Sequence, residues 1–383
     1  MRGLARTVSA ARLVDGVGGR VRSGRFCVVS ERAGGRAGLC ALALLTVVML
    51  GLTGCRSAPI PVVTPTDGYG FSVGASQIWM SPENADRELD AVAKTGARWL
   101  RVHIDWHAVE KERGKFDWAY VDRWVNGARQ RGLTVLGLIV NSPEWAREPG
   151  APMYAPPAKT ADYADFVTAV VKRYQARIRD WEIWNEPNLP RFFGFSDLRP
   201  AGYVALLKAA YPAIKLVQPN STVIVAGLSP AVGVDAPPNF LNDMYIAGAK
   251  GSFDAIAMHP YVYPGGIVAD LSHGWSDVAR VHDVMTAHGA GNMKIWMTEL
   301  GAPTARNTDE GVSQEEQAKQ IVDVLAGIAA TGYCGPAFLY SIRDLDTANA
   351  DEVQDNFGAL LTTDWQPKFA AGVLARPPDG GWR

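Results

Sequence analysis

Two glutamates stand at the ends of apolar segments, where a pair of carboxyl groups could work together. Glu186 lies in the segment WEIWNEPN at residues 181–188, and Glu299 lies in IWMTELG at residues 295–301. Two carboxyl groups that face each other across a cleft usually cleave glycosidic bonds: one protonates the leaving oxygen and the other attacks the anomeric carbon. A lone glutamate at such a place could instead pair with a neighbouring loop, but two of them favour the catalytic interpretation.

The segments around these glutamates belong to a repeating pattern that predicts how they are positioned. Short apolar runs predict eight strands, at residues 71–75, 99–104, 134–140, 181–184, 222–226, 255–258, 294–298 and 337–340. Between the runs the apolar period becomes helical, and the sequence at 313–316 has the form of a capping box. The chain therefore alternates between strands and helices.

Apolar strands that alternate with amphipathic helices predict a parallel sheet covered by helices. Eight such units predict an α/β fold, the (β/α)8 TIM barrel, as a single catalytic domain over residues 69–383. Both glutamates would then face the mouth of the barrel at the C-terminal ends of its strands. An open doubly wound sheet is the alternative, although no glycine-rich dinucleotide fingerprint follows the first strand.

The motifs around the two glutamates resemble those of a known group of enzymes. WNEPN at 184–188 and TELG at 298–301 are similar to the retaining glycoside hydrolases of clan A, most closely glycoside hydrolase family 39 and family 5-like barrels. The resemblance covers residues 70 to about 371. It implies that Glu186 is the acid/base residue, that Glu299 is the nucleophile, and that Asn185 hydrogen-bonds the 2-hydroxyl group of the sugar.

The second predicted strand offers further residues for the substrate site. Alternation along it sends Arg101, His103 and Asp105 to one side, and we expect Arg101 and His103 to contribute to substrate binding. The resemblance implies an arginine that braces the nucleophile. Arg101 is the candidate, because a cation near Glu299 would keep the carboxylate ionised. A buried pair between Arg101 and Asp105 is the alternative.

The sixth predicted strand runs into His259 and Tyr261, which resemble the His-x-Tyr of the clan. This resemblance implies that both residues belong to the substrate site, with Tyr261 beside the nucleophile. A histidine satisfied within the core is the alternative for His259. The six histidines show no metal-ligand spacing, so we expect no metal and no other cofactor.

Aromatic residues also follow the predicted strands and could stack on sugar rings. We expect Trp145, after the third strand, and Tyr340, at the end of the eighth, to contact substrate. Many relatives in the clan carry a tryptophan at the end of strand eight, whereas here the nearest one downstream is Trp365. Any one of these rings could instead belong to the core. Further aromatic residues after strands are Trp106, Phe192, Phe193, Tyr263 and Trp275.

The N-terminal region has the pattern of an export signal. Residues 1–54 carry eight arginines and two acidic residues, and 37–54 form an uncharged apolar run. The run leads into LTGC at 52–55, which resembles the lipobox of bacterial lipoproteins and implies cleavage before Cys55 and lipidation of its thiol. An uncleaved transmembrane anchor is the alternative. Residues 55–68, rich in proline and threonine, are expected to form a tether.

The remaining residues have a composition that limits the class of partner. After residue 54 the chain carries 30 basic and 37 acidic residues, and this acidic balance argues against nucleic acid. All twelve tryptophans lie in the same part, and flat aromatic surfaces suit sugar rings. Without the signal, Cys334 is the one thiol beside Cys55, so we expect no disulfide.

These observations predict a retaining glycosidase that acts as a monomer on an oligo- or polysaccharide. We expect it to be lipid-anchored to the outer face of a bacterial cytoplasmic membrane, with an envelope, capsule or biofilm glycan as substrate. Two alternatives remain open. One is a non-catalytic sugar-binding lipoprotein on a barrel scaffold, and the other is a transglycosylase, in which a sugar replaces water as the acceptor.

Overall fold

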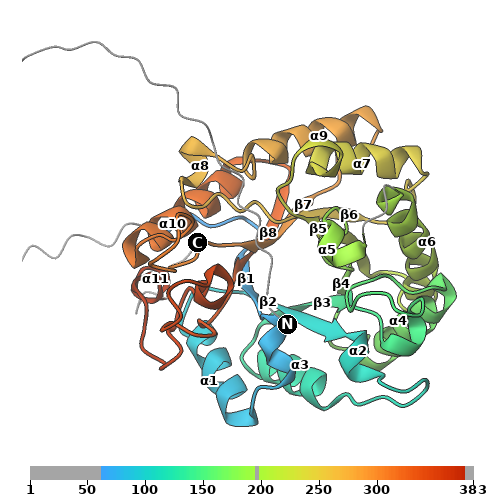
Figure 1. The fold of residues 1–383 in the computed structure, drawn as a ribbon, viewed down its shortest axis with the longest axis horizontal. Coiled ribbons are helices and arrows are strands. Elements are labelled where there is room, and N and C mark those ends of the chain that lie inside the picture. The colour runs from blue at the N-terminus through green and yellow to red at the C-terminus, as the bar shows by residue number, and fades with distance from the viewer. Residues whose placement is uncertain (1–61, 195–197, 376–383) are drawn as a thin grey trace, which may run out of the picture. The chain divides into compact units, whose positions relative to one another are not determined.

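Eight parallel strands close into a barrel inside a ring of helices (Figure 1). The computed structural model describes residues 62–194 and 198–375. Each strand pairs with the next along the chain, and the last pairs with the first. The predicted (β/α)8 barrel is therefore confirmed. The strands are β1 Tyr69–Ser72, β2 Trp99–Asp105, β3 Thr134–Val140, β4 Asp180–Ile183, β5 Thr222–Leu228, β6 Ala255–Met258, β7 Ile295–Leu300 and β8 Cys334–Tyr340.

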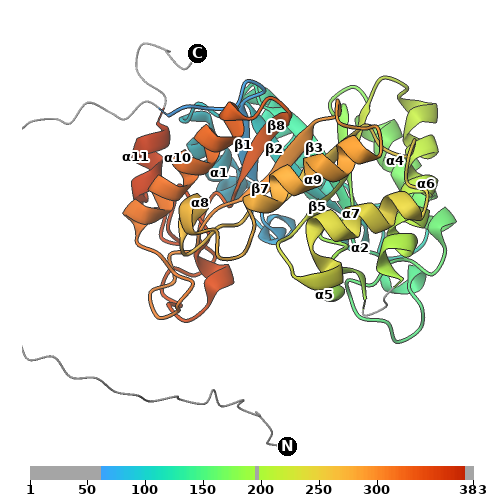
Figure 2. The same cartoon turned by 90° about the horizontal axis from the view of Figure 1, so that it is seen from above.

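Helices between the strands cover the outside of the barrel (Figures 1 and 2). The longer ones are α1 Pro82–Ala93, α3 Ala119–Gln130, α4 Thr160–Tyr174, α6 Arg199–Val217, α7 Pro237–Ile246, α9 Ser276–Ala287 and α10 Gln314–Ala330. The shorter ones are α2 Trp106–Val109, α5 Pro190–Phe193, α8 Gly266–Ala269 and α11 Phe369–Leu374. Single 3₁₀ turns occur at η1 Ala75–Ile78, η2 Glu144–Ala146, η3 Gly233–Asp235 and η4 Val353–Asn356.

The helices form where the apolar periodicity predicts them. The apolar stripe of α3 is buried at Val121 and Trp124, and that of α4 is buried at Phe166. At the start of α10 the hydroxyl oxygen of Ser313 accepts a hydrogen bond from the backbone N–H of Glu316 at 3.1 Å. The predicted capping box is therefore present, and the buried stripes attach the helices to the barrel.

The interior of the barrel has an apolar floor with polar side chains above it. The floor is a cluster on which Trp99 packs, formed by Leu136, Ile224, Ala255, Ala257, Trp296 and Phe338. Arg101 lies two residues beyond Trp99 on β2, and Thr298 lies two residues beyond Trp296 on β7. Because side chains two apart on a strand share a face, these polar groups lie toward the C-terminal ends of the strands.

Two strands end earlier than predicted where they approach the candidate site. β4 ends at Ile183 instead of Trp184, because Trp184 and Glu186 adopt positive φ angles of 72° and 45° and turn the chain away from the sheet. β1 lies at Tyr69–Ser72 instead of 71–75. The turn after β4 aims the side chain of Glu186 into the mouth of the barrel.

β7 also has an irregularity at the site. It continues to Leu300, past the predicted end at 298, and its pairing with β8 shifts register between Met297 and Leu300. Thr298 and Glu299 are consecutive residues, yet both reach polar groups inside the barrel, since Thr298 contacts Glu182 and Glu299 contacts Arg101. A register shift of this kind lets neighbouring side chains break the usual alternation.

The predicted signal and lipidated cysteine fall outside this part of the chain, whereas the predicted tether at 55–68 overlaps it at 62–68, where Val62 is buried in the core. The signal at 1–54 and Cys55 precede the first described residue. Across residues 62–194 and 198–375, no helix combines the length and apolar character needed to cross a membrane. Cys334, the thiol expected to stand alone, is free and buried on β8.

Candidate active site

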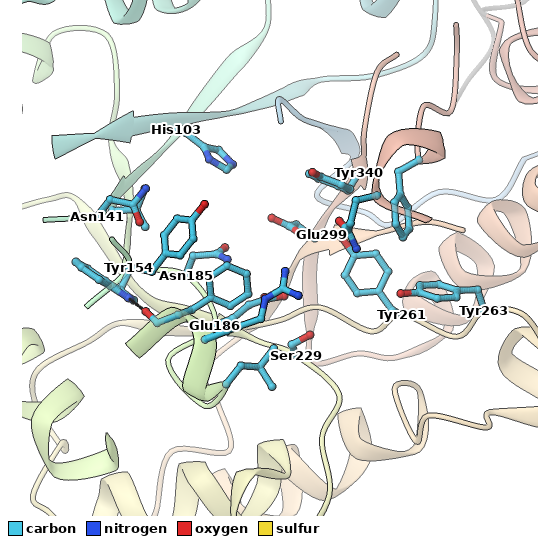
Figure 3. Close-up of a pocket in the computed structure, with 17 residues that line it drawn as sticks. His103, Asn141, Tyr154, Asn185, Glu186, Ser229, Tyr261, Tyr263, Glu299 and Tyr340 are labelled. Carbon is cyan, nitrogen blue, oxygen red and sulfur yellow. Dashed lines mark hydrogen bonds between the residues drawn. The ribbon is translucent and has the colours of Figure 1, made fainter. Parts of the chain in front are cut away.

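A cavity of about 310 Å³ opens at the C-terminal ends of the strands. Six of the predicted site residues line it: His103, Asn185, Glu186, Tyr261, Glu299 and Tyr340. In Figure 3, Asn185 and Glu186 lie on one side of this space, and Glu299 and Tyr261 lie on the other. The barrel thus brings together side chains from strands that are far apart in the sequence.

The two glutamates lie close together across the cavity. A carboxylate oxygen of Glu186 and one of Glu299 are within 4.8 Å of each other. An inverting enzyme keeps its two carboxyl groups about 6.5–9.5 Å apart to leave room for a water molecule, whereas a retaining enzyme holds them about 5–5.5 Å apart. The observed spacing therefore suits direct attack by one carboxylate on the anomeric carbon.

Glu299 is held as an anion by two donors. Its Oε1 accepts a hydrogen bond from Nη1 of Arg101 at 2.5 Å, and its Oε2 accepts one from the hydroxyl of Tyr261 at 2.7 Å. Burial raises the pKa of Glu299, but the nearby charges of His259 and Arg101 outweigh it and lower the pKa to about 2. This carboxylate is ionised and fixed in orientation, as a nucleophile requires.

Arg101 has a second carboxylate partner, Glu182, which was not predicted from the sequence. Its Nε lies 2.6 Å from Oε2 of Glu182, and its Nη2 lies 3.1 Å from Oε1 of the same residue. Glu182 is fully buried on β4, four residues before Glu186. The available signal was an acidic residue inside an otherwise apolar strand, because a buried charge needs a partner.

Asp105 does not pair with Arg101, so that alternative for the arginine is wrong. Asp105 instead follows the strand and accepts hydrogen bonds from the N–H of Ala108 at 3.0 Å and from the amide of Asn141 at 2.6 Å. It caps the short helix α2. The reason is the end of β2 at Asp105, where the chain turns into this helix.

Glu186 is positioned by the backbone turn after β4 and by His259. The N–H of Glu186 donates to the carbonyl of Gly227 at 3.2 Å, and its Oε1 lies 2.8 Å from Nδ1 of His259. His259 is fully buried, and its Nε2 lies 3.1 Å from the hydroxyl of Thr298. Both ring nitrogens of His259 thus have hydrogen-bond partners inside the barrel, and one of those partners is Glu186. His259 is therefore both a core histidine and a residue of the site, the two interpretations that the sequence left open.

Two further predicted residues present polar atoms to the cavity. Oδ1 of Asn185 accepts a hydrogen bond from Nη2 of Arg101 at 2.9 Å, and within residues 62–194 and 198–375 its amide NH₂ group has no partner, so it can donate to a ligand. His103 is partly buried, and desolvation together with the charge of Arg101 lowers its pKa to about 3. Its Nε2 has no hydrogen-bond partner among the described residues, so a neutral imidazole is available to a sugar hydroxyl.

Trp145, which was predicted to contact substrate, does not line the cavity. Its indole N–H donates to the backbone carbonyl of Glu110 at 2.9 Å, and its ring packs edge-on against Trp106 with centroids 5.5 Å apart. The guanidinium of Arg113 covers the ring at 4.4 Å. The loop after β3 therefore folds this side chain into an aromatic cluster outside the site.

Other aromatic rings form the walls. Tyr340 lines the cavity as predicted and contacts Phe357 with ring centroids 5.6 Å apart. Trp365 lies elsewhere, between Arg87 and Arg343. The aromatic residues of the cavity wall are Tyr154, Trp184, Phe192, Tyr261, Tyr263, Tyr340 and Phe357. Tyr154 and Phe357 come from long loops, and no sequence pattern marked them.

Glu186, His259 and Glu299 are also the one trio of potential metal ligands found within residues 62–194 and 198–375. Their arrangement does not suit a cation. Both oxygens of Glu299 already receive hydrogens, from Arg101 and Tyr261, and Arg101 places a positive charge on the same carboxylate. The donor set therefore favours acid–base and nucleophilic chemistry over metal chemistry.

Comparison with known proteins agrees with this chemistry. Residues 64–334 match the family model of the cellulases, glycosyl hydrolase family 5. A family 39 glycoside hydrolase from the gut symbiont Bacteroides cellulosilyticus is 22% identical with a TM-score of 0.64, and the match covers 83% of this chain and 65% of that one. A monomeric β-xylosidase from Caulobacter crescentus is 19% identical with a TM-score of 0.61, covering 82% and 69%. A xylanase from Paenibacillus barcinonensis is 14% identical with a TM-score of 0.60, covering 84% and 99%.

Proposed function

This chain belongs to the cellulase family, glycosyl hydrolase family 5, and we propose that it is a retaining glycosidase that cleaves a polysaccharide by double displacement. The observation that carries the proposal is the pairing of two unlike glutamates across one cavity. Glu299 is an anion held by Arg101 and Tyr261, whereas Glu186 contacts His259 and has no arginine partner among the described residues. A nucleophile must be ionised and an acid/base residue must carry a proton, so the two glutamates need different environments.

In the first step Glu299 acts as the nucleophile. Its carboxylate attacks the anomeric carbon, and the bond from that carbon to the leaving oxygen breaks. Glu186 gives its proton to the leaving oxygen, so the departing sugar leaves as an alcohol and Glu186 becomes a carboxylate. The product of this step is a glycosyl ester on Glu299.

In the second step the same residues act in reverse. The carboxylate of Glu186 takes a proton from water, and the water oxygen attacks the anomeric carbon of the glycosyl ester. The bond to Glu299 breaks, which regenerates its carboxylate and leaves Glu186 protonated for the next cycle. Two displacements at one carbon give net retention of the anomeric configuration.

The substrate would be held by the polar groups and rings of the cavity. The free amide NH₂ of Asn185 and Nε2 of His103 are suited to sugar hydroxyls. The ring of Tyr340 is suited to the apolar face of a sugar, because flat aromatic surfaces pack well against it. The Asn185 amide lies next to the acid/base residue, and its bond to the 2-hydroxyl would strengthen in the transition state.

We further propose that the substrate is a glycan of the cell envelope, a capsule or a biofilm. The support is the sequence alone: the apolar run at 37–54 and the Leu-Thr-Gly-Cys ending at Cys55 fit a lipid-anchored exported protein. Such an anchor would hold the barrel, as a monomer, at the outer face of the cytoplasmic membrane on the tether that follows Cys55.

The experiment is a screen of the purified chain against aryl glycosides and isolated envelope glycans, with the anomer of the first product observed by NMR. We expect hydrolysis of at least one β- or α-linked substrate, with the product released in the configuration of the substrate. Release of the opposite anomer would contradict double displacement. Transfer of the sugar to another sugar in preference to water would assign the chain to transglycosylation.

A further inference from the structure

A buried chain of hydrogen bonds runs beneath the cavity from Glu186 into the barrel. Nδ1 of His259 lies 2.8 Å from Oε1 of Glu186, and Nε2 of the same ring lies 3.1 Å from Oγ1 of Thr298. The hydroxyl of Thr298 lies 3.0 Å from Oε1 of Glu182. His259, Thr298 and Glu182 are all fully buried, so each of these bonds has a defined direction.

The direction of the chain follows from Glu182. This carboxylate accepts hydrogen bonds from Nε of Arg101 at 2.6 Å and from the N–H of Gly227 at 2.9 Å, so both of its oxygens already act as acceptors in an ion pair with the guanidinium. An ionised carboxylate only accepts hydrogen bonds, so the single hydrogen of the Thr298 hydroxyl must point to Glu182. The Thr298 oxygen can then only accept from His259, and Nε2 of His259 must carry a hydrogen.

We propose that Thr298 and Glu182 are positioning residues for the acid/base step. They hold His259 with a hydrogen on Nε2 and its Nδ1 toward Oε1 of Glu186, so that Oε2 of Glu186 is left to exchange the catalytic proton. Within the described residues nothing bonds Oε2, and Glu186 lines the cavity. The inference rests on the proposed role of Glu186 as the acid/base residue.

The charges around His259 are consistent with this arrangement. Burial lowers the pKa of His259, but the attraction of Glu299 and the bond to Glu186 outweigh it and raise the pKa. An imidazolium donates from both nitrogens, which satisfies Thr298 and Glu186 together. The titratable groups that face the ring are Glu186, Glu299, Arg101, His103 and Tyr261.

The proton on Nδ1 has a use in the first step. As the catalytic proton leaves Oε2, negative charge develops on the carboxylate of Glu186. The Nδ1–H of His259 points at Oε1 of that carboxylate and stabilises this charge without itself being transferred. In the second step the same bond keeps Oε1 occupied, so water gives its proton to Oε2.

β5 leaves room for this ring because it carries glycine at 227. A Cβ added to Gly227 would lie 2.0 Å from Nε2 of His259 and 2.7 Å from Oγ1 of Thr298. The backbone of Gly227 also donates to Glu182 and accepts from the N–H of Glu186. Glycine inside a strand often marks such a close approach, and here it fixes the place of the imidazole.

The tautomer of His259 is measured directly by ¹⁵N NMR of the full chain labelled in histidine, with the signal identified by its absence in His259→Asn. We expect Nε2 to stay protonated across the pH range in which the protein is folded, with only Nδ1 titrating. A neutral His259 with its hydrogen on Nδ1 would overturn the inference. This measurement does not depend on which glutamate is the acid/base residue, so it separates the two proposals.

The kinetic test compares Thr298→Val with Thr298→Ser, since valine keeps the shape of threonine and serine keeps the hydroxyl. Valine removes the acceptor from Nε2–H, so the imidazolium loses its Nδ1 proton at lower pH. We expect the alkaline limb of kcat to move down by about half a pH unit or more in Thr298→Val and to stay in place in Thr298→Ser. An identical limb in the wild type and Thr298→Val would overturn the proposal, and if the valine variant does not fold, the wild-type NMR spectrum decides.

Discussion

Arg101 forms a buried ion pair with Glu299, the proposed nucleophile, with Nη1 of the arginine 2.5 Å from Oε1 of the glutamate. The guanidinium also binds Glu182 and Asn185, so one side chain from β2 fixes groups on β4 and β7. Its charge attracts both carboxylates and keeps Glu299 ionised at any pH where the enzyme would work. The site is therefore assembled around a cation that the substrate need not touch.

Arg101→Met should disable the site and destabilise the fold. It leaves two buried carboxylates without their partner, which costs about 3–5 kcal/mol in the free energy of unfolding. We expect kcat/KM to fall by about 100-fold or more as well. Urea unfolding and steady-state kinetics measure the two effects.

Arg131→Met is the matched control for that variant. Arg131 pairs with Asp86 and Asp90, whose side chains are 60% and 59% exposed. Surface pairs of this kind contribute about 0–1 kcal/mol, and this one lies outside the cavity. A loss of stability in Arg101→Met no larger than in Arg131→Met would contradict the importance of the buried pair.

Tyr261→Phe should raise the pKa of Glu299. Burial raises that pKa, while the charges of His259 and Arg101 and the Tyr261 hydroxyl lower it to about 2, so removing the hydroxyl moves it upward. Because ionised Glu299 is the active form, the acidic limb of kcat/KM should move to higher pH. Tyr263→Phe, which alters another tyrosine of the cavity wall, should leave that limb unchanged.

The same shift has a consequence for stability. A carboxyl group with a lowered pKa stabilises the fold above its unfolded value, 4.5, and this contribution is lost as pH falls toward 2. In Tyr261→Phe the loss should still begin near the unfolded value, but it should be smaller and be complete at a higher pH than in the wild type. The free energy of unfolding of both proteins, measured in urea at pH values between these limits, tests this expectation. The same pH dependence in the wild type and in Tyr261→Phe would contradict it.

Tyr340→Ala and Trp145→Ala should have different effects, because the Tyr340 ring lines the cavity and the Trp145 ring packs outside it. Tyr340 lines the cavity, so its loss should raise KM for a small aryl glycoside by about tenfold. Trp145 packs on Trp106 away from the cavity, so its loss should lower Tm while KM stays within about twofold of the wild type. Steady-state kinetics and thermal unfolding of both variants provide the comparison. A raised KM in Trp145→Ala would show that Trp145 contacts substrate after all.

Cys55→Ala should abolish lipidation. If the thiol of Cys55 receives the lipid, the variant has no acceptor and should remain with residues 1–54 attached. Metabolic labelling with a fatty acid and the mass of the purified protein measure both events. Acylation and cleavage at the same position in the variant would show that the lipobox interpretation is wrong.

Much of the site could be predicted because strand ends in a barrel are marked in the sequence. Glu186 and Glu299 end apolar runs, and Arg101 lies on a strand that alternates toward the interior. Once the barrel is predicted, its closure brings these residues to one mouth. The eight strands themselves follow from apolar runs that helices separate.

The parts that were missed depend on contacts across the barrel. Glu182 and Thr298 lie inside apolar strands, and only the pairing of β2, β4 and β7 shows that they complete a network. Trp145 was misplaced because a residue that follows a strand can turn either toward the cavity or into the core. Phe357 comes from the loop after β8, whose path no periodic pattern describes.

The central claim is that Glu299 attacks carbon while Glu186 exchanges the proton. Glu186→Gln cannot supply a base, yet an aryl glycoside with a good leaving group needs no acid in the first step. The second step should then stall, and a glycosyl ester should accumulate on Glu299. Glu299→Gln should remain folded and form no adduct, because no neighbouring group replaces the nucleophile.

Intact-protein mass spectrometry of Glu186→Gln mixed with such a substrate is the most direct measurement, followed by peptide mapping of the modified residue. The account predicts a mass increase of one sugar residue, located on Glu299. A sugar attached to another residue, or turnover in Glu186→Gln and Glu299→Gln close to that of the wild type, would contradict it.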